Sequence, residues 1–232
     1  MRPERIVGIG GPAAVSDELL AALEGHLGVP IDRIAGQNRY ETAVSLAAGH
    51  DRAETVWLAS GEDFPDALAA APAAARDGAP LLLVHPERLP AETADALSRL
   101  GPNRLVVVGG PAAVPDEVAD RAAALTGAIV ERVAGGDRYE TAVAVSRLTY
   151  AEGAPVAGAL LATGRDYPDA LAGGILSAAA GAPILLNDGD GNPATHEELA
   201  RLVRAGASRI LGLGGPNALL DTALPDLADL TL

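Results

Sequence analysis

Short apolar runs alternate with amphipathic segments along the chain, which is the pattern of a parallel sheet covered by helices. Residues 105–108 form one such run, and Gly109 and Gly110 close it, so we expect a buried strand there. Asp116 and Glu117 begin the amphipathic segment that follows, where acidic side chains complement the dipole of a helix. The same pattern predicts further strands at residues 55–59, 80–84, 129–134, 159–162 and 183–186.

The chain also repeats itself. Arg-Ile-Ala-Gly-Gln-Asn-Arg-Tyr-Glu-Thr-Ala begins at Arg33 and returns at Arg132, 99 residues later, as Arg-Val-Ala-Gly-Gly-Asp-Arg-Tyr-Glu-Thr-Ala. Asp-Phe-Pro-Asp-Ala-Leu, which begins at residue 63, returns at residue 166 as Asp-Tyr-Pro-Asp-Ala-Leu. Repetition on this scale favours a function spread over equivalent sites over one that rests on a single special residue.

The strand pattern and the repeat together predict an α/β fold of tandem (βα)4 units with parallel sheets. We expect a partial unit at residues 1–32, the βα tail of a preceding repeat, followed by unit 1 at residues 33–131 and unit 2 at residues 132–232. Glycine pairs close the equivalent strand in all three parts, where tight strand-to-helix turns are expected. These pairs are Gly10 and Gly11, Gly109 and Gly110, and Gly214 and Gly215.

Capping residues predict where helices start. Asn38 and Asp137 each stand three residues before a glutamate, which is the spacing of a capping box that satisfies backbone N–H groups of the first turn. The first aspartate of each Asp-x-Pro-Asp segment is expected to cap the next helix, with the proline in the first turn. The aspartates of both segments are spaced like cap residues rather than an acid–base pair. We therefore assign structural or interface roles to Asp63, Asp66, Asp166 and Asp169.

Composition narrows the function classes. The net charge of −14 argues against general binding to a nucleic-acid backbone, which needs a basic footprint. All 17 basic residues are arginine, so a Walker lysine and a Schiff base are excluded, and the absence of cysteine excludes disulfides and thiolate metal sites. No apolar stretch reaches the ~18 residues that a membrane span needs. The sequence enters a strand directly, without a leader.

Arg39 and Arg138 are the residues that local physics explains least. Each begins a helix, where a cation opposes the helix dipole by ~0.3–1 kcal/mol. The compensating partner is either a carboxylate of an Asp-x-Pro-Asp segment or an anionic ligand. Tyr40 and Tyr139 follow the arginines, and each either stacks on a sugar ring or anchors its helix as a half-buried side chain.

One segment fits a dinucleotide-binding fingerprint. Gly8-x-Gly10-x-x-Ala13 follows a strand, and Asp32 lies near the distance expected for a ribose carboxylate. The sister unit has Val107 where Gly8 stands, which favours a tight strand-to-helix turn over cofactor binding.

Residues 187–192 resemble the start of a calcium loop, but Pro193 and Leu199 stand where a glycine and a bidentate glutamate should be, so a solvent-exposed turn is expected. The four histidines do not recur at equivalent positions, and no Gly-x-Ser-x-Gly elbow exists. We therefore predict no catalytic residue, no metal site and no cofactor.

The repeated phrases resemble the cell wall binding repeat type 2 family over nearly all of residues 5–225. They are Arg-[Ile/Val]-Ala-Gly-x-[Asn/Asp]-Arg-Tyr-Glu-Thr-Ala, Asp-[Phe/Tyr]-Pro-Asp-Ala-Leu, Ala-Pro-[Leu/Ile]-Leu-Leu and Val-x-Gly-Gly-Pro-x-Ala-Val, in that order. The resemblance implies Rossmann-like repeats, commonly three in tandem about a pseudo-threefold axis. It also implies secreted or surface proteins that bind anionic cell-wall polysaccharides non-covalently. It places polymer binding in the Arg-Tyr pairs and Pro-x-Leu-Leu segments: Arg39, Tyr40, Arg138, Tyr139, Pro80, Leu82, Leu83, Pro183, Leu185 and Leu186.

The chain departs from the family pattern by having two complete repeats, a partial first unit, and neither a leader nor an effector domain. A fragment of a larger surface protein is expected to explain all three. The resulting prediction is a non-catalytic module that anchors a cell-surface protein to an anionic wall glycopolymer. Other repeats, in the same chain or in a neighbouring copy of a homo-oligomer, are further partners. The alternatives are a cytosolic Rossmann-type enzyme that binds a nucleotide or sugar phosphate, and a self-assembling surface scaffold.

Overall fold

Strands and helices alternate along the chain as the apolar pattern predicts. A computed structural model of the protein describes residues 3–188, 191–215 and 218. Its strands are β1 (Ile6–Ile9), β2 (Ile31–Ile34), β3 (Thr55–Ser60), β4 (Leu81–Val84), β5 (Arg104–Val108), β6 (Ile129–Val133), β7 (Ala159–Thr163), β8 (Ile184–Asn187) and β9 (Ile210–Gly212). Its helices are α1 (Asp17–Leu27), α2 (Arg39–Leu46) with the 3-10 turn η1 (Ala47–Gly49), α3 (Pro65–Arg76), α4 (Ala91–Leu100), α5 (Asp116–Thr126), α6 (Arg138–Thr149), α7 (Pro168–Ala180) and α8 (Pro193–Arg204).

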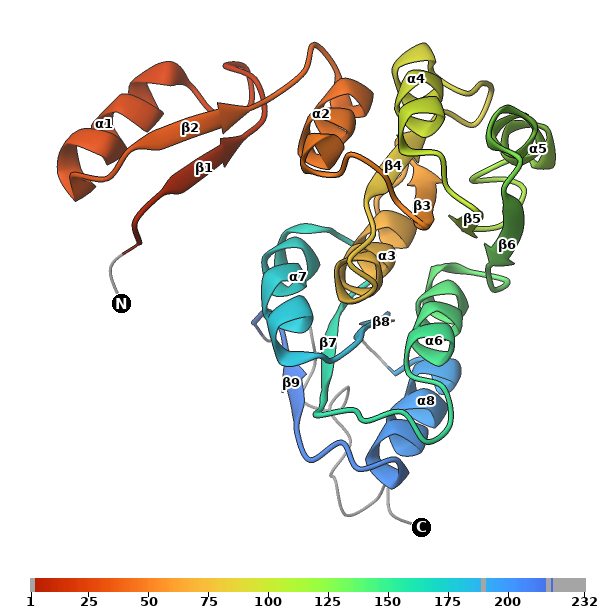
Figure 1. Cartoon of the computed structure of the whole chain (residues 1–232). Coiled ribbons are helices and arrows are strands. Elements are labelled where there is room, and N and C mark those ends of the chain that lie inside the picture. The colour runs from red at the N-terminus through yellow and green to blue at the C-terminus, as the bar shows by residue number, and fades with distance from the viewer. Residues whose placement is uncertain (1–2, 189–190, 216–217, 219–232) are drawn as a thin grey trace.

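The named strands pair in parallel and form three sheets (Figure 1). β1 pairs with β2, the second sheet has the order β4-β3-β5-β6, and the third has the order β8-β7-β9. The register repeats between units, because Trp57 of β3 lies opposite Val106 of β5 and Leu160 of β7 lies opposite Leu211 of β9. The predicted α/β fold of repeated parallel units is confirmed.

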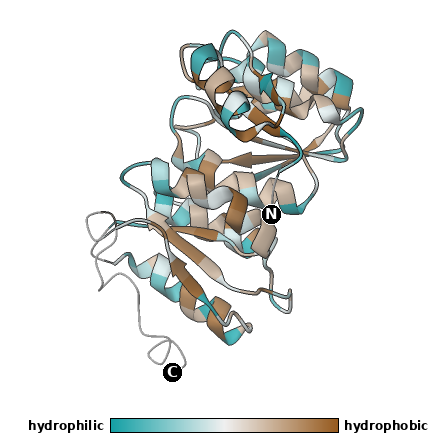
Figure 2. Ribbon diagram, turned by 90° about the vertical axis from the view of Figure 1, so that its left-hand side faces the viewer, coloured by the Kyte–Doolittle hydropathy of each residue, from teal (hydrophilic) through white to brown (hydrophobic). Residues whose placement is uncertain are grey.

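Alternate residues of the central strands enter different cores, as expected of strands buried on both faces. Val56 and Leu58 pack with α4 and α5, whereas Trp57 packs with α3 in a core that continues through α6 to Leu160 of β7. Figure 2 shows the hydrophobic strands with helices of mixed hydropathy around them. The two repeat units therefore share one core rather than meeting across a polar boundary.

The expected unit boundaries fall inside strands. β2 spans the boundary between residues 32 and 33, and β6 spans the one between residues 131 and 132. β6 completes the sheet of β3, β4 and β5, whereas α6 packs on β8 and α8 of the following sheet. The division into residues 1–32, 33–131 and 132–232 stays a prediction about the sequence repeat.

The first strands and helix form a small layer of their own (Figure 1). β1, α1 and β2 are the counterparts of β5, α5 and β6, but β1 pairs with β2 alone in the described part of the chain. No residue of α1 is buried, and Ile9 and Leu19 are half exposed. This layer therefore presents an apolar surface that the equivalent elements of unit 1 bury.

The capping predictions are partly confirmed. The Asn38 and Asp137 side chains accept hydrogen bonds from the backbone N–H of the glutamates three residues later, at 2.9 and 2.8 Å. The prediction that Asp63 and Asp166 cap α3 and α7 is wrong by one residue. Phe64 and the equivalent tyrosine hold the cap positions, because each aspartate side chain accepts the N–H of its immediate neighbour and turns the chain earlier. The prolines begin both helices as expected.

A buried carboxylate links α6 to α8. Glu198 is fully buried and accepts hydrogen bonds from Ser146 at 2.6 Å, from Arg147 at 2.9 Å and from Arg201 at 2.6 and 2.9 Å. Burial raises the pKa of Glu198, but the hydrogen bonds from Arg201, Ser146 and Arg147 outweigh it and hold the pKa below its ordinary value. The ionised group is therefore the form that this packing stabilises.

Candidate functional site

The two units meet where α3 of unit 1 packs against α6 and α7 of unit 2, and we call this contact the seam (Figure 1). Small residues make the approach possible, because Ala69, Pro72 and Ala73 of α3 are buried there. The loops at the carboxyl ends of β3 and β7 lie at the same end of the seam as the starts of α2 and α6. The arginines and aspartates singled out from the sequence come together at this end.

Arg138 bridges the two units. Its Nη1 donates to the backbone oxygen of Gly164 at 2.7 Å, and its Nη2 lies 3.5 Å from the Asp63 carboxylate of unit 1. Its guanidinium carbon also lies 5.7 Å from the centre of the Phe64 ring. The carboxylate partner expected from the sequence is therefore present for Arg138. Because both side chains of the pair are partly exposed, the pair is worth at most ~1 kcal/mol.

Arg39 repeats half of this arrangement. It donates to the backbone oxygen of Gly61, as Arg138 does to Gly164. Its charge partner is Glu62 of its own unit, at 3.9 Å, and its side chain is 57% exposed. Among the described residues, no aspartate of another unit reaches Arg39. Its guanidinium group can accordingly contact an anionic ligand with little loss of existing interactions.

Tyr40 and Tyr139 anchor their helices. A Cβ atom on Gly61 would come within 2.6 Å of the Tyr40 ring, and one on Gly164 within 2.5 Å of the Tyr139 ring, so each ring packs closely against a glycine. Tyr40 is buried and donates to Glu62 at 2.5 Å. Burial and this hydrogen bond raise the pKa of Tyr40 to about 12. Of the two alternatives, Tyr40 therefore fits the one in which the side chain anchors its helix, because it has little exposed surface for stacking on a sugar.

A shallow pocket of about 360 Å³ opens beside Arg39 at the end of the seam. Phe64 of unit 1 and Tyr167 of unit 2 line it, with ring centres 5.6 Å apart and planes inclined by 58°. Leu83 and Leu171 form apolar walls. Sequence reasoning missed this aromatic pair, although both rings occupy the variable position of the Asp-x-Pro-Asp segments. The pocket combines the Arg39 cation and two rings with the carboxylates of Glu62 and Asp63, so a sugar could pack on the rings while its charged group contacts Arg39.

The Pro-x-Leu-Leu segments lie deeper than the sequence suggests. Leu82, Leu185 and Leu186 have at most 1% of their surface exposed and have no surface to offer a polymer, so this part of the predicted site is corrected. These three leucines occupy strand positions that face a core. Leu83 is half-buried and lines the seam pocket, whereas the prolines of both segments are buried.

The Asp66 side chain fills the crevice where β3 and β5 end. Strand order reverses between these two strands, which is where open α/β sheets bind ligands. A Cβ atom on Gly109 would collide with the Asp66 carboxylate, and Asp169 meets Gly214 in the same way. Burial and the nearby Asp63 raise the pKa of Asp66, and Arg138 opposes this shift. A carboxylate in this position repels the phosphate that a nucleotide would bring.

The strand-to-helix turns are held by glycines and by an arginine whose role the sequence analysis did not predict. Gly10, Gly109 and Gly214 have φ values of 109°, 104° and 112°, a conformation that favours glycine, which agrees with the predicted tight turns. Arg132 donates to the backbone oxygen of Gly109 at 2.7 Å and pairs with Asp116 at 2.8 Å, so it fixes the turn to the helix that follows. The repeated arginine at the start of each sequence repeat was the signal for this role.

The remaining expectations concern metals and membranes. Asn192 caps α8, and residues 189–190 of the calcium-like segment lie outside the described residues. Within the described ranges, no cluster of three or more His, Cys, Asp or Glu side chains has the geometry to hold a metal ion. The helices of the same ranges are too short or too polar to cross a membrane.

Comparison with known proteins places these repeats among cell-wall proteins. The family model "Cell wall binding domain 2 (CWB2)" matches residues 33–119 and 132–223. The chain is 29% identical to N-acetylmuramoyl-L-alanine amidase LytC of Bacillus subtilis over 190 residues, which cover 82% of this chain and 36% of that protein. It is 33% identical to the amidase enhancer of the same organism over 166 residues, which cover 70% of this chain and 22% of that protein. The chain thus spans about a third or less of these relatives.

Two solved structures share the fold. Cwp6 from Clostridium difficile superposes with a TM-score of 0.74 at 27% identity, covering 84% of this chain and 30% of that one. Cwp8 from Clostridium difficile superposes with a TM-score of 0.76 at 28% identity, covering 92% of this chain and 36% of that one.

Proposed function

Because the chain belongs to the Cell wall binding domain 2 family, we propose that it is a non-catalytic module that binds an anionic cell-wall polysaccharide and holds an attached protein at the cell surface. The relatives LytC and the amidase enhancer are longer than this chain, and the matched region is the part they have in common with it. A region shared by two longer proteins with different names is better explained by a common binding function than by a common reaction.

The observation that carries the proposal is the seam pocket beside Arg39. The chain has a net charge of −14, so an anionic polymer must be held by local arginines, and here Arg39 shares its pocket with the Glu62 and Asp63 carboxylates. Arg39 is 57% exposed and pairs with Glu62 at the long distance of 3.9 Å. Phe64 and Tyr167 add ring faces beside it, and rings of this kind pack against sugar rings. A polymer would thus contact both units at once.

The rival nucleotide-binding enzyme has less support. The crevice at the ends of β3 and β5 holds the Asp66 carboxylate, where a phosphate group would have to lie. The aspartates of the Asp-x-Pro-Asp segment are used in packing, because Asp63 pairs with Arg138 and Asp66 contacts the Gly109 turn. They are therefore poorly placed to act together as an acid and a base.

Another repeat unit is the partner that the open surfaces fit. In unit 2, Val145, Pro183 and Ile184 lie under α3, and the space left between them is about 10 Å³. The equivalent groove of unit 1, formed by α2, α3 and β4, has a volume of about 600 Å³ and is open. The complementary face of α7 is also open, since Ile175 is 82% exposed. A further repeat unit, from the same or a neighbouring chain, would cover both faces by the seam contact seen here.

Substituting the two arginines tests the proposed polymer contact. We expect Arg39→Ala to lower co-sedimentation with native cell walls at least fivefold while leaving Tm within about 2 °C, because the arginine makes few interactions within the chain. Arg138→Ala is expected to lower Tm, since it loses its contacts with Gly164, Asp63 and Phe64. Arg121→Ala is the matched control, because Arg121 is exposed on α5 and its loss changes the charge equally.

The same assay on walls stripped of their anionic polymers separates charge recognition from other binding. Wild-type protein should sediment with native walls and stay in solution with stripped walls. Equal sedimentation with both wall preparations, or an Arg39→Ala protein that binds like Arg121→Ala, would contradict the proposal.

A further inference from the structure

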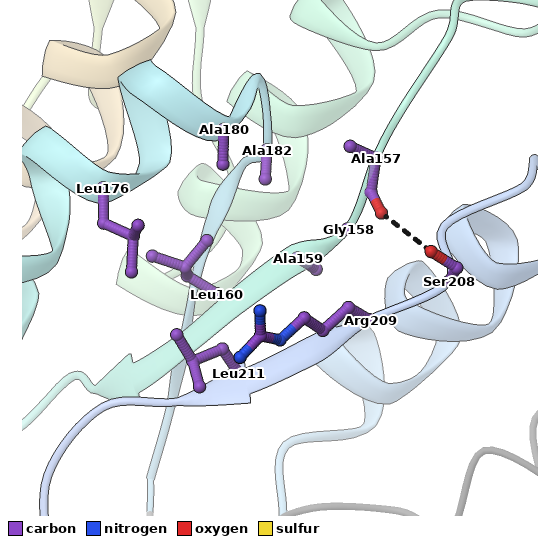
Figure 3. A pocket seen from close by; sticks show the side chains of 10 residues that line it. All are labelled: Ala157, Gly158, Ala159, Leu160, Leu176, Ala180, Ala182, Ser208, Arg209 and Leu211. Carbon is purple, nitrogen blue, oxygen red and sulfur yellow. Dashed lines mark hydrogen bonds between the residues drawn. The ribbon is translucent and has the colours of Figure 1, made fainter.

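A second pocket, separate from the seam, lies between α7 and β9 of unit 2 and has a volume of about 360 Å³ (Figure 3). Its walls are largely apolar, and at one end Ser208 Oγ donates a hydrogen bond of 3.5 Å to the backbone oxygen of Ala157. Figure 3 shows Leu160, Leu176 and the Arg209 guanidinium group converging on the space. An apolar space with a single cation at its edge is the composition of a small-molecule site.

The repeat shows what occupies the same place in unit 1. Trp57 and Leu160 have the same register, since Trp57 lies opposite Val106 and Leu160 opposite Leu211. Trp57 is 1% exposed, and its Nε1 donates to the Asp77 carboxylate at 3.2 Å. The counterpart of Asp77, 103 residues later, is Ala180, which lines the pocket. Unit 2 therefore lacks an indole ring and a carboxylate at the position where unit 1 contains both.

The cation at the edge of the pocket is also treated differently in the two units. Arg104 of unit 1 pairs with Glu131 at 2.6 Å across the sheet. Its counterpart Arg209 is exposed, and among residues 3–188, 191–215 and 218 it has no ion-pair partner. The Arg209 backbone is held close to β7, because Ala159 donates to its carbonyl oxygen at 2.9 Å and Gly158 leaves room for that oxygen. The Arg209 backbone is thus fixed beside the pocket, and within the described residues no carboxylate pairs with its guanidinium group.

We propose that this pocket binds a planar aromatic carboxylate, with the ring in the space that Trp57 fills in unit 1 and the carboxylate on Arg209. Apolar surfaces of this size favour a ring over water. A guanidinium group binds a carboxylate through two parallel hydrogen bonds. The proposal is independent of polysaccharide binding, because the pocket lies at the amino ends of β7 and β9 and shares no lining residue with the seam pocket.

Calorimetric titration of the whole chain with indole-3-acetate tests the site. We expect saturable binding of one molecule per chain, at least tenfold tighter than binding of indole, which lacks the carboxylate, or of tryptamine, which carries a positive charge instead. Arg209→Gln should remove the preference for indole-3-acetate over indole. Equal affinity for the three probes, or no saturation with millimolar probe, would overturn the proposal.

Leu160→Trp introduces the side chain of unit 1 and should abolish binding by filling the pocket. Leu125→Trp, on the exposed side of α5, is the matched control and should leave the affinity unchanged. Circular dichroism establishes that both variants are folded. If Leu160→Trp does not fold, the wild-type chain with bound probe is studied by NMR. Nuclear Overhauser contacts between the probe ring and the Leu176 methyl groups would support the site, and their absence at saturation would rule it out.

Discussion

Replacing Trp57 with leucine tests whether the two units differ in packing as their comparison indicates. The Trp57 side chain is 1% exposed among α3, β3 and β5, whereas unit 2 has Leu160 in the same register beside an open pocket. The substitution therefore gives unit 1 the composition of unit 2 at one position. If the indole fills space that leucine leaves empty, unit 1 must lose stability.

The expected loss follows from the burial of the ring. Trp→Ala substitutions in cores cost ~3–5 kcal/mol, and a buried leucine side chain restores ~1.5–3 kcal/mol, which leaves about 2 kcal/mol. The hydrogen bond to Asp77 adds less than ~1 kcal/mol, because Asp77 is exposed and water replaces the indole N–H. For a chain of this length, 2 kcal/mol corresponds to a fall in Tm of about 4–8 °C.

Calorimetric and circular-dichroism melting curves measure this change. Fluorescence is unsuitable, since Trp57 is the only tryptophan of the chain and the variant loses it. Leu125→Ala serves as the control, because Leu125 is about half exposed and its truncation should change Tm by less than about 1 °C. A Trp57→Leu protein that melts within 1 °C of wild type would refute the packing argument and with it the template used for the second pocket.

Two further predictions test the polar core and the open groove. Glu198→Gln should lower the free energy of unfolding by about 2–3 kcal/mol at pH 7, measured by urea titration. This loss is smaller than the ~3–5 kcal/mol expected when a fully enclosed ion pair is broken, because the arginines around Glu198 are partly exposed. Because the folded-state pKa of Glu198 is lowered, this difference should shrink as the pH falls below about 4, and a constant difference would be contrary to the argument. We expect light scattering of the wild type to rise with concentration as chains associate through the open groove of unit 1. Leu46→Glu places a charge in this groove and should abolish the rise, whereas the exposed-site variant Leu125→Glu should not. Association that survives Leu46→Glu would show that chains meet through another face.

The repeated sequence predicts the fold because its signals are local. Asn38 and Asp137 cap helices through contacts within one turn, and Gly109 adopts the positive φ that its turn requires. The buried strands follow from continuous apolar runs such as the one that ends at Val108. Such features need no knowledge of what lies across the sheet, so they can be read from a single chain.

The site could be predicted only in part because its contacts join residues that are distant in the sequence. The Asp63 partner of Arg138 comes from the preceding unit, and Phe64 meets Tyr167 across the seam. The burial of Leu185 depends on helices from both faces, which the repeated motif alone does not specify. The pocket beside Leu160 could not be predicted from the sequence either, since a leucine in an apolar strand predicts a filled core.

The contrast between Arg39 and Arg138 connects these observations. The two arginines occupy the same position of the same motif, and each donates to the glycine oxygen of its own unit. Of the two, only Arg138 contacts an aspartate and an aromatic ring of the preceding unit. A unit therefore neutralises the arginine of its successor when it docks, and the exposed arginine of a tandem array marks a seam where that docking is incomplete. If Arg39 acquires such a neighbour from another repeat unit, its contribution to polymer binding should fall as its contribution to stability rises, because one guanidinium group cannot fully satisfy both partners.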